Sequence, residues 1–302
     1  MSGGATYVQS GAELDIQNSI ALGNSGGKTL YLNGTGTGTA GALRNVSGTN
    51  SDAGTVILQT NTTIGVDANT LTLSGVVSGA GTSSLTKVGA GTLALSGANT
   101  FTGGTTVNAG TLLVNNTSGS GTGTGTLNIA SGGSLGGTGT IGSVTTIAGA
   151  LGVSGASPGI LTFSSGVTLQ TGSATTININ GSTTRGTDYD GITFNGGVTI
   201  TGGTLTFNIG VPIASGSVLN IFIPATVSST FTSVTATGIG GYSGSFSLGP
   251  GNTSYIYNYG GQVVTLDLPS GDLIFAIPEP STYAAIFGAL TLLAASCRRR
   301  RA

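Results

Sequence analysis

The sequence LTKVGAGTLALSGANTFTGGTTVNAGTLLV, residues 85–114, contains the pattern that decides the fold. Polar and apolar residues alternate in Thr92-Leu93-Ala94-Leu95, and glycines flank this run. Alternation with a period of two places every second side chain on one face of a β-strand. Glycine permits the sharp turns that separate such strands. The stretch therefore predicts short strands joined by tight turns.

The same alternation continues along most of the chain. It is found at residues 126–129, 176–179 and 204–209, and Gly-Gly pairs close many of the runs. No segment before residue 281 shows a helical period with capping residues. We therefore expect an all-β body.

Short sequence motifs recur along the chain at roughly similar intervals. Leu73-Ser74-Gly75 returns 22 positions later, and the Gly-Thr-Leu of residues 91–93 returns at 110–112 and again at 125–127. A loose period of this size indicates a solenoid, and some 13 coils of about 20 residues would form a rod of roughly 60 Å. An antiparallel sandwich or barrel is the alternative. The scarcity of Asn-Gly and Asp-Gly hairpin turns between the runs favours the solenoid.

The chain carries little charge, which excludes several classes of function. Its 302 residues include 8 Lys and Arg, 9 Asp and Glu and no His. Four of the basic residues are the consecutive Arg298–Arg301, so the remainder is mildly acidic. Such a body does not attract nucleic-acid phosphates or anionic lipid headgroups. The 57 glycines suggest disorder, but the low charge and abundant Thr, Val and Ile oppose it.

Residues 85–114 resemble the autotransporter-associated β-strand repeat nearly position for position. Residues 41–48, 136–142, 157–161 and 188–190 continue the likeness, which covers most of residues 40–210. The resemblance implies a right-handed parallel β-helix of the autotransporter passenger type. Autotransporters end in an outer-membrane β-barrel, and the residues after Asp190 leave no room for one. We therefore do not expect this chain to export itself.

A separate signal occupies the end of the chain. Pro278-Glu279-Pro280 precedes an apolar segment, residues 283–297, and the run Arg298, Arg299, Arg300 and Arg301. As a helix the segment would span roughly 22–25 Å, somewhat less than the ~30 Å bilayer core. The arginines should remain in the cytoplasm as a membrane stop, which leaves the body outside.

This arrangement resembles the PEP-CTERM sorting signal. The resemblance implies that an exosortase recognises Pro278, Glu279 and Pro280, and that a single C-terminal transmembrane helix is a temporary anchor. A plain membrane anchor is the alternative. The protein would cross the inner membrane and then reside at the cell surface or in the extracellular matrix. Residues 1–7 lack the basic start and apolar run of an export signal, so we expect the natural reading frame to begin upstream.

Candidate catalytic residues are few. Asp188 and Asp190 form the one close acidic pair, and as alternate residues on a strand they would share a face about 7 Å apart. Arg185 is the one basic neighbour. Without His, and with Cys297 alone in the apolar segment, the chain lacks ligands for zinc and a base for a serine nucleophile. Neither the Gly-Gly-x-Gly-x-Asp calcium repeat nor a phosphate loop occurs. We expect no cofactor and no metal.

The sequence divides into four parts. Residues 1–84 should form N-terminal solenoid coils, residues 85–116 the repeat, residues 117–272 further coils and a C-terminal β cap, and residues 275–301 the sorting signal with its transmembrane segment. We expect a non-catalytic, exported structural or adhesion protein. Its expected partners are an exosortase-like processing enzyme, the membrane, and extracellular polysaccharide or surface proteins, without nucleic acid. A β-helix polysaccharide-degrading enzyme and a detached autotransporter passenger are the alternatives.

Overall fold

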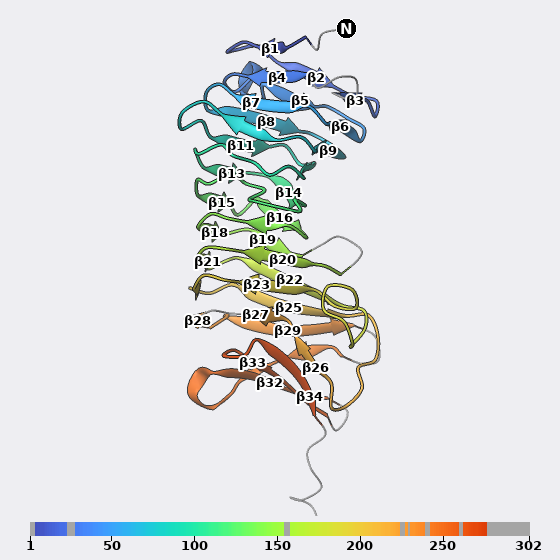
Figure 1. Cartoon of the computed structure of the whole chain (residues 1–302). Coiled ribbons are helices and arrows are strands. Elements are labelled where there is room, and N and C mark those ends of the chain that lie inside the picture. Colours follow the sequence, from blue (N-terminus) through green and yellow to red (C-terminus); the bar gives the residue numbers. More distant parts are fainter. Residues whose placement is uncertain are drawn as a thin grey trace, which may run out of the picture.

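The protein is a column of short strands stacked along one axis. The computed structural model describes residues 4–22, 28–153, 158–223, 227–228, 230–238, 242–259 and 262–276. The chain winds from coils at the N-terminal end to an antiparallel sheet at the other end (Figure 1). Successive coils are joined by parallel strand pairing, as in a β-solenoid. The all-β prediction is confirmed for the described residues. Their strands pair in parallel along the column, and antiparallel strand pairs occur in the C-terminal sheet and at the last strand of one long sheet, so the column is not an antiparallel sandwich or barrel.

Each coil passes in turn through three sides of the column. The first side is sheet A in the N-terminal coils and sheet D in the later ones, and sheets B and C run the length of the column. Sheet A contains β1 (Thr6–Val8), β4 (Thr29–Leu32), β7 (Thr55–Leu58) and β10 (Val77–Gly79). Sheet D contains β17 (Thr140–Ile141), β20 (Ile160–Phe163), β23 (Gly191–Phe194) and β27 (Phe222–Ile223).

The two long sheets contain most of the strands. Sheet B contains β2 (Leu14–Ile16), β5 (Leu43–Asn45), β8 (Thr62–Val66), β11 (Leu85–Val88), β13 (Thr105–Val107), β15 (Leu127–Ile129), β18 (Thr145–Ile147), β21 (Val167–Leu169), β24 (Val198–Ile200) and β28 (Val227–Ser228). Sheet C contains β3 (Ala21–Leu22), β6 (Asn50–Asp52), β9 (Thr70–Leu73), β12 (Thr92–Leu95), β14 (Gly110–Val114), β16 (Gly133–Gly137), β19 (Ala150–Gly152), β22 (Ala174–Ile179), β25 (Thr204–Ile209), β29 (Ser233–Gly238) and, antiparallel to β29, β30 (Gly244–Ser245).

The strand register confirms two of the three predicted repeats. Leu95 pairs with Leu73, 22 positions away, and Leu93 pairs with Leu112, 19 positions away. The third prediction is wrong, because Leu127 lies in sheet B beside Thr105, whereas Leu112 continues in sheet C to Leu135. The sequence Gly-Thr-Leu therefore occupies different positions in different coils.

Coil length explains why the expected number of coils was too high. In the central coils, Leu85 pairs with Thr62 on one side and with Thr105 on the other, close to the expected spacing. Nearer the ends, Leu14 pairs with Leu43 and Val167 with Val198, so those coils are clearly longer. The longer coils carry loops outside the column. Sheet B, which every coil crosses once, consequently contains 10 strands within the described ranges, fewer than the sequence spacing predicts.

The core is built from apolar side chains stacked in register. Leu71, Leu93, Leu112, Leu135 and Leu151 follow one another up sheet C, and each is at most 1% exposed. On sheet D, the rings of Phe163 and Phe194 stack with their centroids 5.4 Å apart, and the ring of Phe222 lies tilted against Phe194 at 6.2 Å. Repetition of one side-chain type at one coil position lets each coil bury its apolar face against its neighbours.

Between β10 and β17 the third side of the column is closed by irregular chain. Buried asparagine replaces the missing strand pairing there. Asn99 accepts from the Val77 amide at 2.7 Å and donates to the Gly121 carbonyl at 2.6 Å, so one side chain joins three coils. Backbone bonds from Thr100 to Val77 and from Thr124 to Phe101 complete the closure.

Sheet E covers the C-terminal end of the column (Figure 1). It pairs its strands antiparallel and buries Leu219, Leu266, Leu273 and Phe275. Short 3-10 turns at Thr37–Thr39 and Pro250–Asn252 lie outside the sheets. The strands of sheet E are β26 (Val218–Asn220), β31 (Ser247–Leu248), β32 (Ser254–Tyr259), β33 (Gln262–Asp267) and β34 (Asp272–Ala276).

Candidate functional site: a charged cluster and an uncharged outer face

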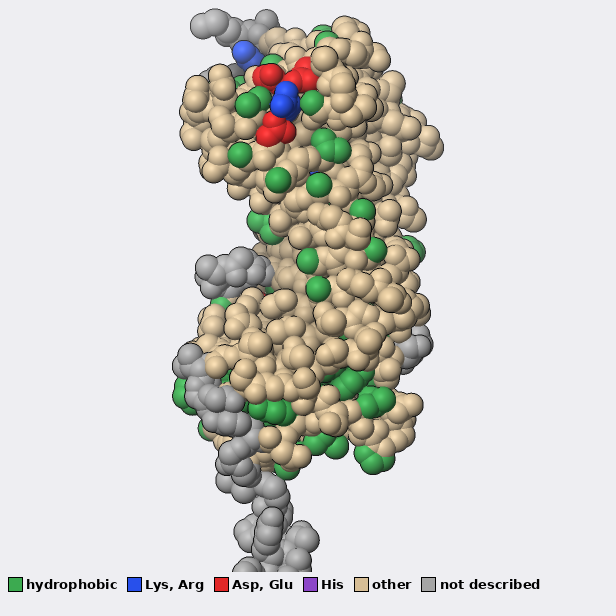
Figure 2. All heavy atoms as spheres, turned by 180° about the vertical axis from the view of Figure 1, so that it is seen from behind, with side chains coloured by type: hydrophobic (Ala, Val, Ile, Leu, Met, Phe, Trp, Pro, Cys, Tyr) green, Lys and Arg blue, Asp and Glu red, His purple; other side chains and the backbone are tan. Residues whose placement is uncertain are grey.

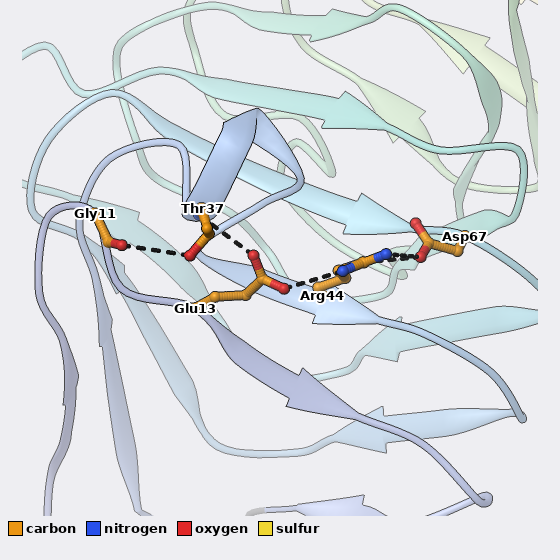
Figure 3. Close-up of polar contacts among 5 residues, drawn as sticks. All are labelled: Gly11, Glu13, Thr37, Arg44 and Asp67. Atoms are coloured by element: carbon orange, nitrogen blue, oxygen red, sulfur yellow. Dashed lines mark hydrogen bonds and ion pairs between the residues drawn. The ribbon is translucent and has the colours of Figure 1, made fainter.

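A cluster of charged side chains lies on the outside of sheet B at the N-terminal end. Arg44 on β5 places Nη1 3.1 Å from Glu13 Oε1 of the preceding coil. Its Nη2 and Nε lie 2.7 and 2.8 Å from Asp67 Oδ2 of the following coil. Glu13 Oε2 also accepts from the Thr37 amide at 3.3 Å, and the Thr37 hydroxyl approaches the Gly11 carbonyl (Figure 3). One guanidinium therefore joins three successive coils.

Hydrogen bonds within the cluster shift the pKa values of its own members. Asp15 lies directly beside Arg44 in the strand register. Partial burial, together with a hydrogen bond to Glu13, raises the pKa of the Asp15 carboxyl. The same hydrogen bond and the one from Arg44 lower the pKa of Glu13, and hydrogen bonds to Asp67 and Glu13 raise the pKa of Arg44. We assign the cluster a structural role, because its ion pairs join one coil to the next.

The cluster was not predicted, because its residues are 23 and 31 positions apart in the sequence. Only the coil length, which the local sequence does not give, brings them together. Figure 2 shows the cluster as a patch of red and blue near the N-terminal end of a face that otherwise carries few charged side chains. Within the described ranges, no three carboxylate, His or Cys side chains gather in a way that could hold a metal ion.

Lys87 is a further charged residue that the sequence analysis did not single out. It lies at an inward position of β11 and is fully buried. Its Nζ donates to the carbonyls of Gly89 and Ala109 at 2.9 Å each and of Val88 at 3.3 Å. Burial lowers the pKa of Lys87 to about 8. The alternation Leu85-in, Thr86-out, Lys87-in was the signal that would have predicted this burial.

The ammonium occupies the corner where two coils turn from sheet B to sheet C. Gly89 in that corner has a φ of +81°, and a Cβ there would lie 2.3 Å from the Val66 carbonyl oxygen. Gly110 at the same corner of the next coil has a φ of +66°. These tightly turned segments leave carbonyl groups that no strand pairs. Lys87 satisfies two of them, in one coil and the next.

Asp188 and Asp190 do not form the paired site that alternate strand positions predict. Asp188 bonds to the side chain of Thr183 and accepts from the amides of Thr183 and Thr184 at 3.0 Å each, and these bonds lower its pKa. Asp190 is fully buried, which raises its pKa, and accepts from the amides of Gly159 and Asn178. One carboxylate thus closes an exposed loop and the other joins two coils inside the column.

Arg185, the basic neighbour expected beside these carboxylates, contacts neither. Its Nε donates to the Asn220 carbonyl at 2.8 Å and its Nη2 to Thr193 Oγ1 at 3.1 Å. Burial lowers its pKa. The loop that carries Asp188 arises because residues 180–190 add about ten residues to a coil that needs about twenty. The local sequence contains no alternation that would have placed a strand there.

The predicted sorting-signal residues Pro278, Glu279 and Pro280 lie outside the described residues, as do Arg298, Arg299, Arg300 and Arg301. Among the residues that are described, no helix has the length and apolarity needed to cross a bilayer. The sorting signal and its transmembrane helix therefore stay predictions.

The remaining outer surface of sheet B is uncharged. In six consecutive coils, the second residue of the sheet B strand points outward and is Thr or Asn. The members of this threonine row pair directly with one another in the strand register: Thr86, Thr106, Asn128, Thr146, Thr168 and Thr199. The row begins where the charged cluster ends, so sheet B presents two chemically different surfaces.

Comparison with known proteins identifies the central coils. Residues 85–114 match the family of passenger-associated transport repeats. The chain is also similar to the adhesin BmaC autotransporter of Brucella suis biovar 1 (strain 1330), with 36% identity over 124 residues. That match covers 38% of this chain and 4% of the relative. The predicted autotransporter-associated repeat is therefore confirmed over residues 85–114.

Proposed function

We propose that this protein is an exported, non-catalytic adhesion or structural protein of the bacterial cell surface. The main support is the combination of a β-solenoid of low charge with a passenger-associated transport repeat and with similarity to an adhesin. A right-handed winding of the solenoid belongs to the same proposal. Stacked coils suit this task because they extend a surface over many repeated coils without needing a disulfide or a metal.

The proposal includes processing at the C-terminal end. Pro278, Glu279 and Pro280 would be recognised by an exosortase-like enzyme, while residues 283–297 hold the chain in the inner membrane as a single helix and the arginines stop its transfer. The support for this processing step comes from the sequence alone. After processing, the body would reside at the cell surface or in the extracellular matrix.

The alternative of a β-helix polysaccharide-degrading enzyme has less support. Paired-carboxylate hydrolysis needs two acids on either side of the scissile bond. Asp188 and Asp190 are the closest acidic pair in the sequence, but each binds a different backbone segment. Asp188 accepts from the Thr183 amide, whereas Asp190 is buried and accepts from the Gly159 amide. The buried Lys87 also contacts only carbonyl groups, away from any exposed face.

The sorting part of the proposal is tested by processing in cells. We would express the full reading frame, with an epitope tag in the exposed turn at Gly81, in a host with and without its exosortase. A shorter exported form with exosortase and a longer membrane-bound form without it are expected. Substitution of Pro278, Glu279 and Pro280 by alanine should reproduce the second result in the first host. The same product in both hosts would reduce the tail to an ordinary anchor.

A further inference from the structure

The face of sheet E that points away from the column carries apolar side chains. Leu266 and Leu273 point toward the core and are fully buried, so the residues that alternate with them point outward. Outward residues form a row across the sheet in the strand register: Val218, Ile274, Thr265, Ile256 and Ser247. Val218 is 54% exposed, and Ile256 and Ile274 are partly exposed. Figure 2 shows hydrophobic side chains gathered toward this end of the molecule.

An acidic pair lies at one end of this outer face. Asp267 on β33 and Asp272 on β34 are direct partners in the register, so two carboxylates lie side by side, where like charges repel. Asp272 accepts from Asn220 Nδ2 at 2.9 Å and Asp267 from the Ser270 amide at 3.1 Å, and both donors are neutral. The ion pairs found among the described residues are those of Arg44, near the other end of the column. The acidic pair therefore has no basic partner in the described part of the chain.

The chain leaves sheet E at the opposite end of the same face. Asp272 begins β34, and Ala276 ends it, paired with Val263. The sequence continues with residues 277–282, then with the apolar residues 283–297 and four arginines. Six extended residues reach at most roughly 20 Å. The apolar segment consequently begins within reach of the outer face of sheet E.

We propose that residues 283–297, while they are outside a bilayer, pack as a helix on the outer face of sheet E, antiparallel to β34. A helix of these 15 residues is roughly 22 Å long, and the five residues of β34 span about 17 Å. A helix that starts above Ala276 therefore ends near the first residue of the strand. There it brings Arg298–Arg301 beside Asp267 and Asp272.

The chemistry of the two surfaces matches in order along β34. The outer face is apolar in the middle and acidic at one end, and the segment is apolar and ends in a basic run. A lipid surface fits this face less well, because anionic headgroups would meet the acidic pair. This inference does not depend on the proposed function. It concerns the chain before the segment enters a membrane, and insertion would release the contact.

Cys297 allows a direct test, because it is the single cysteine of the chain and lies next to the arginines. The full-length chain is synthesised in a cell-free system without membranes and treated with a short thiol-to-thiol crosslinker. The test variant is Thr265→Cys, on the outer face two residues before Asp267. The matched control is Thr146→Cys, which replaces an outward, partly exposed threonine of sheet B. Circular dichroism and melting would verify that both variants are folded.

The proposal predicts a crosslink within one chain between Cys297 and the cysteine of the Thr265→Cys variant. Its yield should exceed that of the control roughly tenfold, because docking raises the effective concentration of the two thiols. Addition of Asp267→Asn and Asp272→Asn to the test variant should lower the yield roughly threefold, and high salt should act in the same direction. Equal yields in the test and control variants, or no crosslink in either, would overturn the proposal.

Two further outcomes would assign the face to another occupant and refute the docked tail. A crosslink that forms only between chains would identify a second copy. In a Cys297→Ser background, protection of Thr265→Cys from a water-soluble maleimide that appears only when lipid vesicles are added would identify the bilayer. Exposure of the tagged chain on cells is measured separately, so failure of the docked tail would leave the proposed function standing.

Discussion

At the scale of single residues, Lys87 shows how a charge is kept inside the solenoid. Its ammonium group donates to three carbonyl groups, and burial lowers its pKa from 10.5 to about 8. The inward position follows from the sequence alternation. Its partners do not, because one of them, Ala109, belongs to the next coil. The sequence could thus predict that Lys87 is buried but not what stabilises it there.

This burial predicts a specific dependence on pH. Below pH 8 both folded and unfolded chains hold the Lys87 proton, and the cost of desolvation is present in full. Between pH 8 and 10.5 the unfolded chain binds more protons, so the free energy of unfolding rises with pH, by at most about 3 kcal/mol. Urea denaturation at pH 7 and pH 10 measures this against Lys87→Met. An unchanged difference between the two proteins would contradict it.

Thr175 is a buried residue whose hydroxyl lacks a partner among the described residues. It interrupts the apolar column of sheet C, where its register neighbours are Leu151 and Leu205. It also lines an apolar cavity of about 20 Å³, which it shares with Leu169, Phe194 and other residues. A cavity and an unpaired hydroxyl both reduce stability.

Replacement of this hydroxyl by a methyl group should therefore stabilise the protein. We expect Thr175→Val to raise the free energy of unfolding by about 1 kcal/mol, because the side chain keeps its shape and loses a desolvated polar atom. Thr176→Val, one position along β22 and facing outward, is the matched control and should change little. Thermal unfolding of the two variants side by side would decide, and a destabilised Thr175→Val would reveal a hidden partner of the hydroxyl.

At the scale of strands, the alternation of polar and apolar residues predicted where strands occur, but it predicted only part of their pairing. The runs at residues 92–95 and 204–209 are strands β12 and β25 with the expected bounds. Their pairing could be predicted where coils have nearly equal length, as between Leu73 and Leu95. The pairing could not be predicted where a loop such as residues 180–190 lengthens a coil. Such a loop changes the sequence separation of paired residues without changing either strand.

The stacking of leucines in sheet C gives a test at this scale. Leu112 and Leu113 are neighbours on β14, but only Leu112 joins the buried column between Leu93 and Leu135. We expect Leu112→Ala to lower the free energy of unfolding by about 2–5 kcal/mol, because it leaves a cavity between coils. Leu113→Ala should cost much less. Equal losses measured by urea denaturation would contradict the assignment of the inward face.

At the scale of the whole molecule, the two ends of the column differ. Sheet E covers the C-terminal end with an antiparallel sheet, and the sequence analysis placed a β cap there without its pairing. The N-terminal coils carry the ion pairs of Arg44, which the sequence did not predict. Between them, the uncharged threonine row begins in the coils that match the autotransporter-associated repeat, at Thr86 and Thr106, and continues beyond them to Thr199. This arrangement leaves the outer face of sheet B as the surface that an exported protein would present.

Exposure of that surface on the living cell is the central claim, and it can be measured directly. An epitope tag inserted in the exposed turn at Gly81, where the structure leaves open space around the backbone, would be probed with antibody on intact and on lysed cells. A cytoplasmic protein in the same culture reports whether the cells remain closed. We expect the tag to bind antibody on intact cells and to be removed by added protease. A tag that becomes accessible only after lysis would contradict the account.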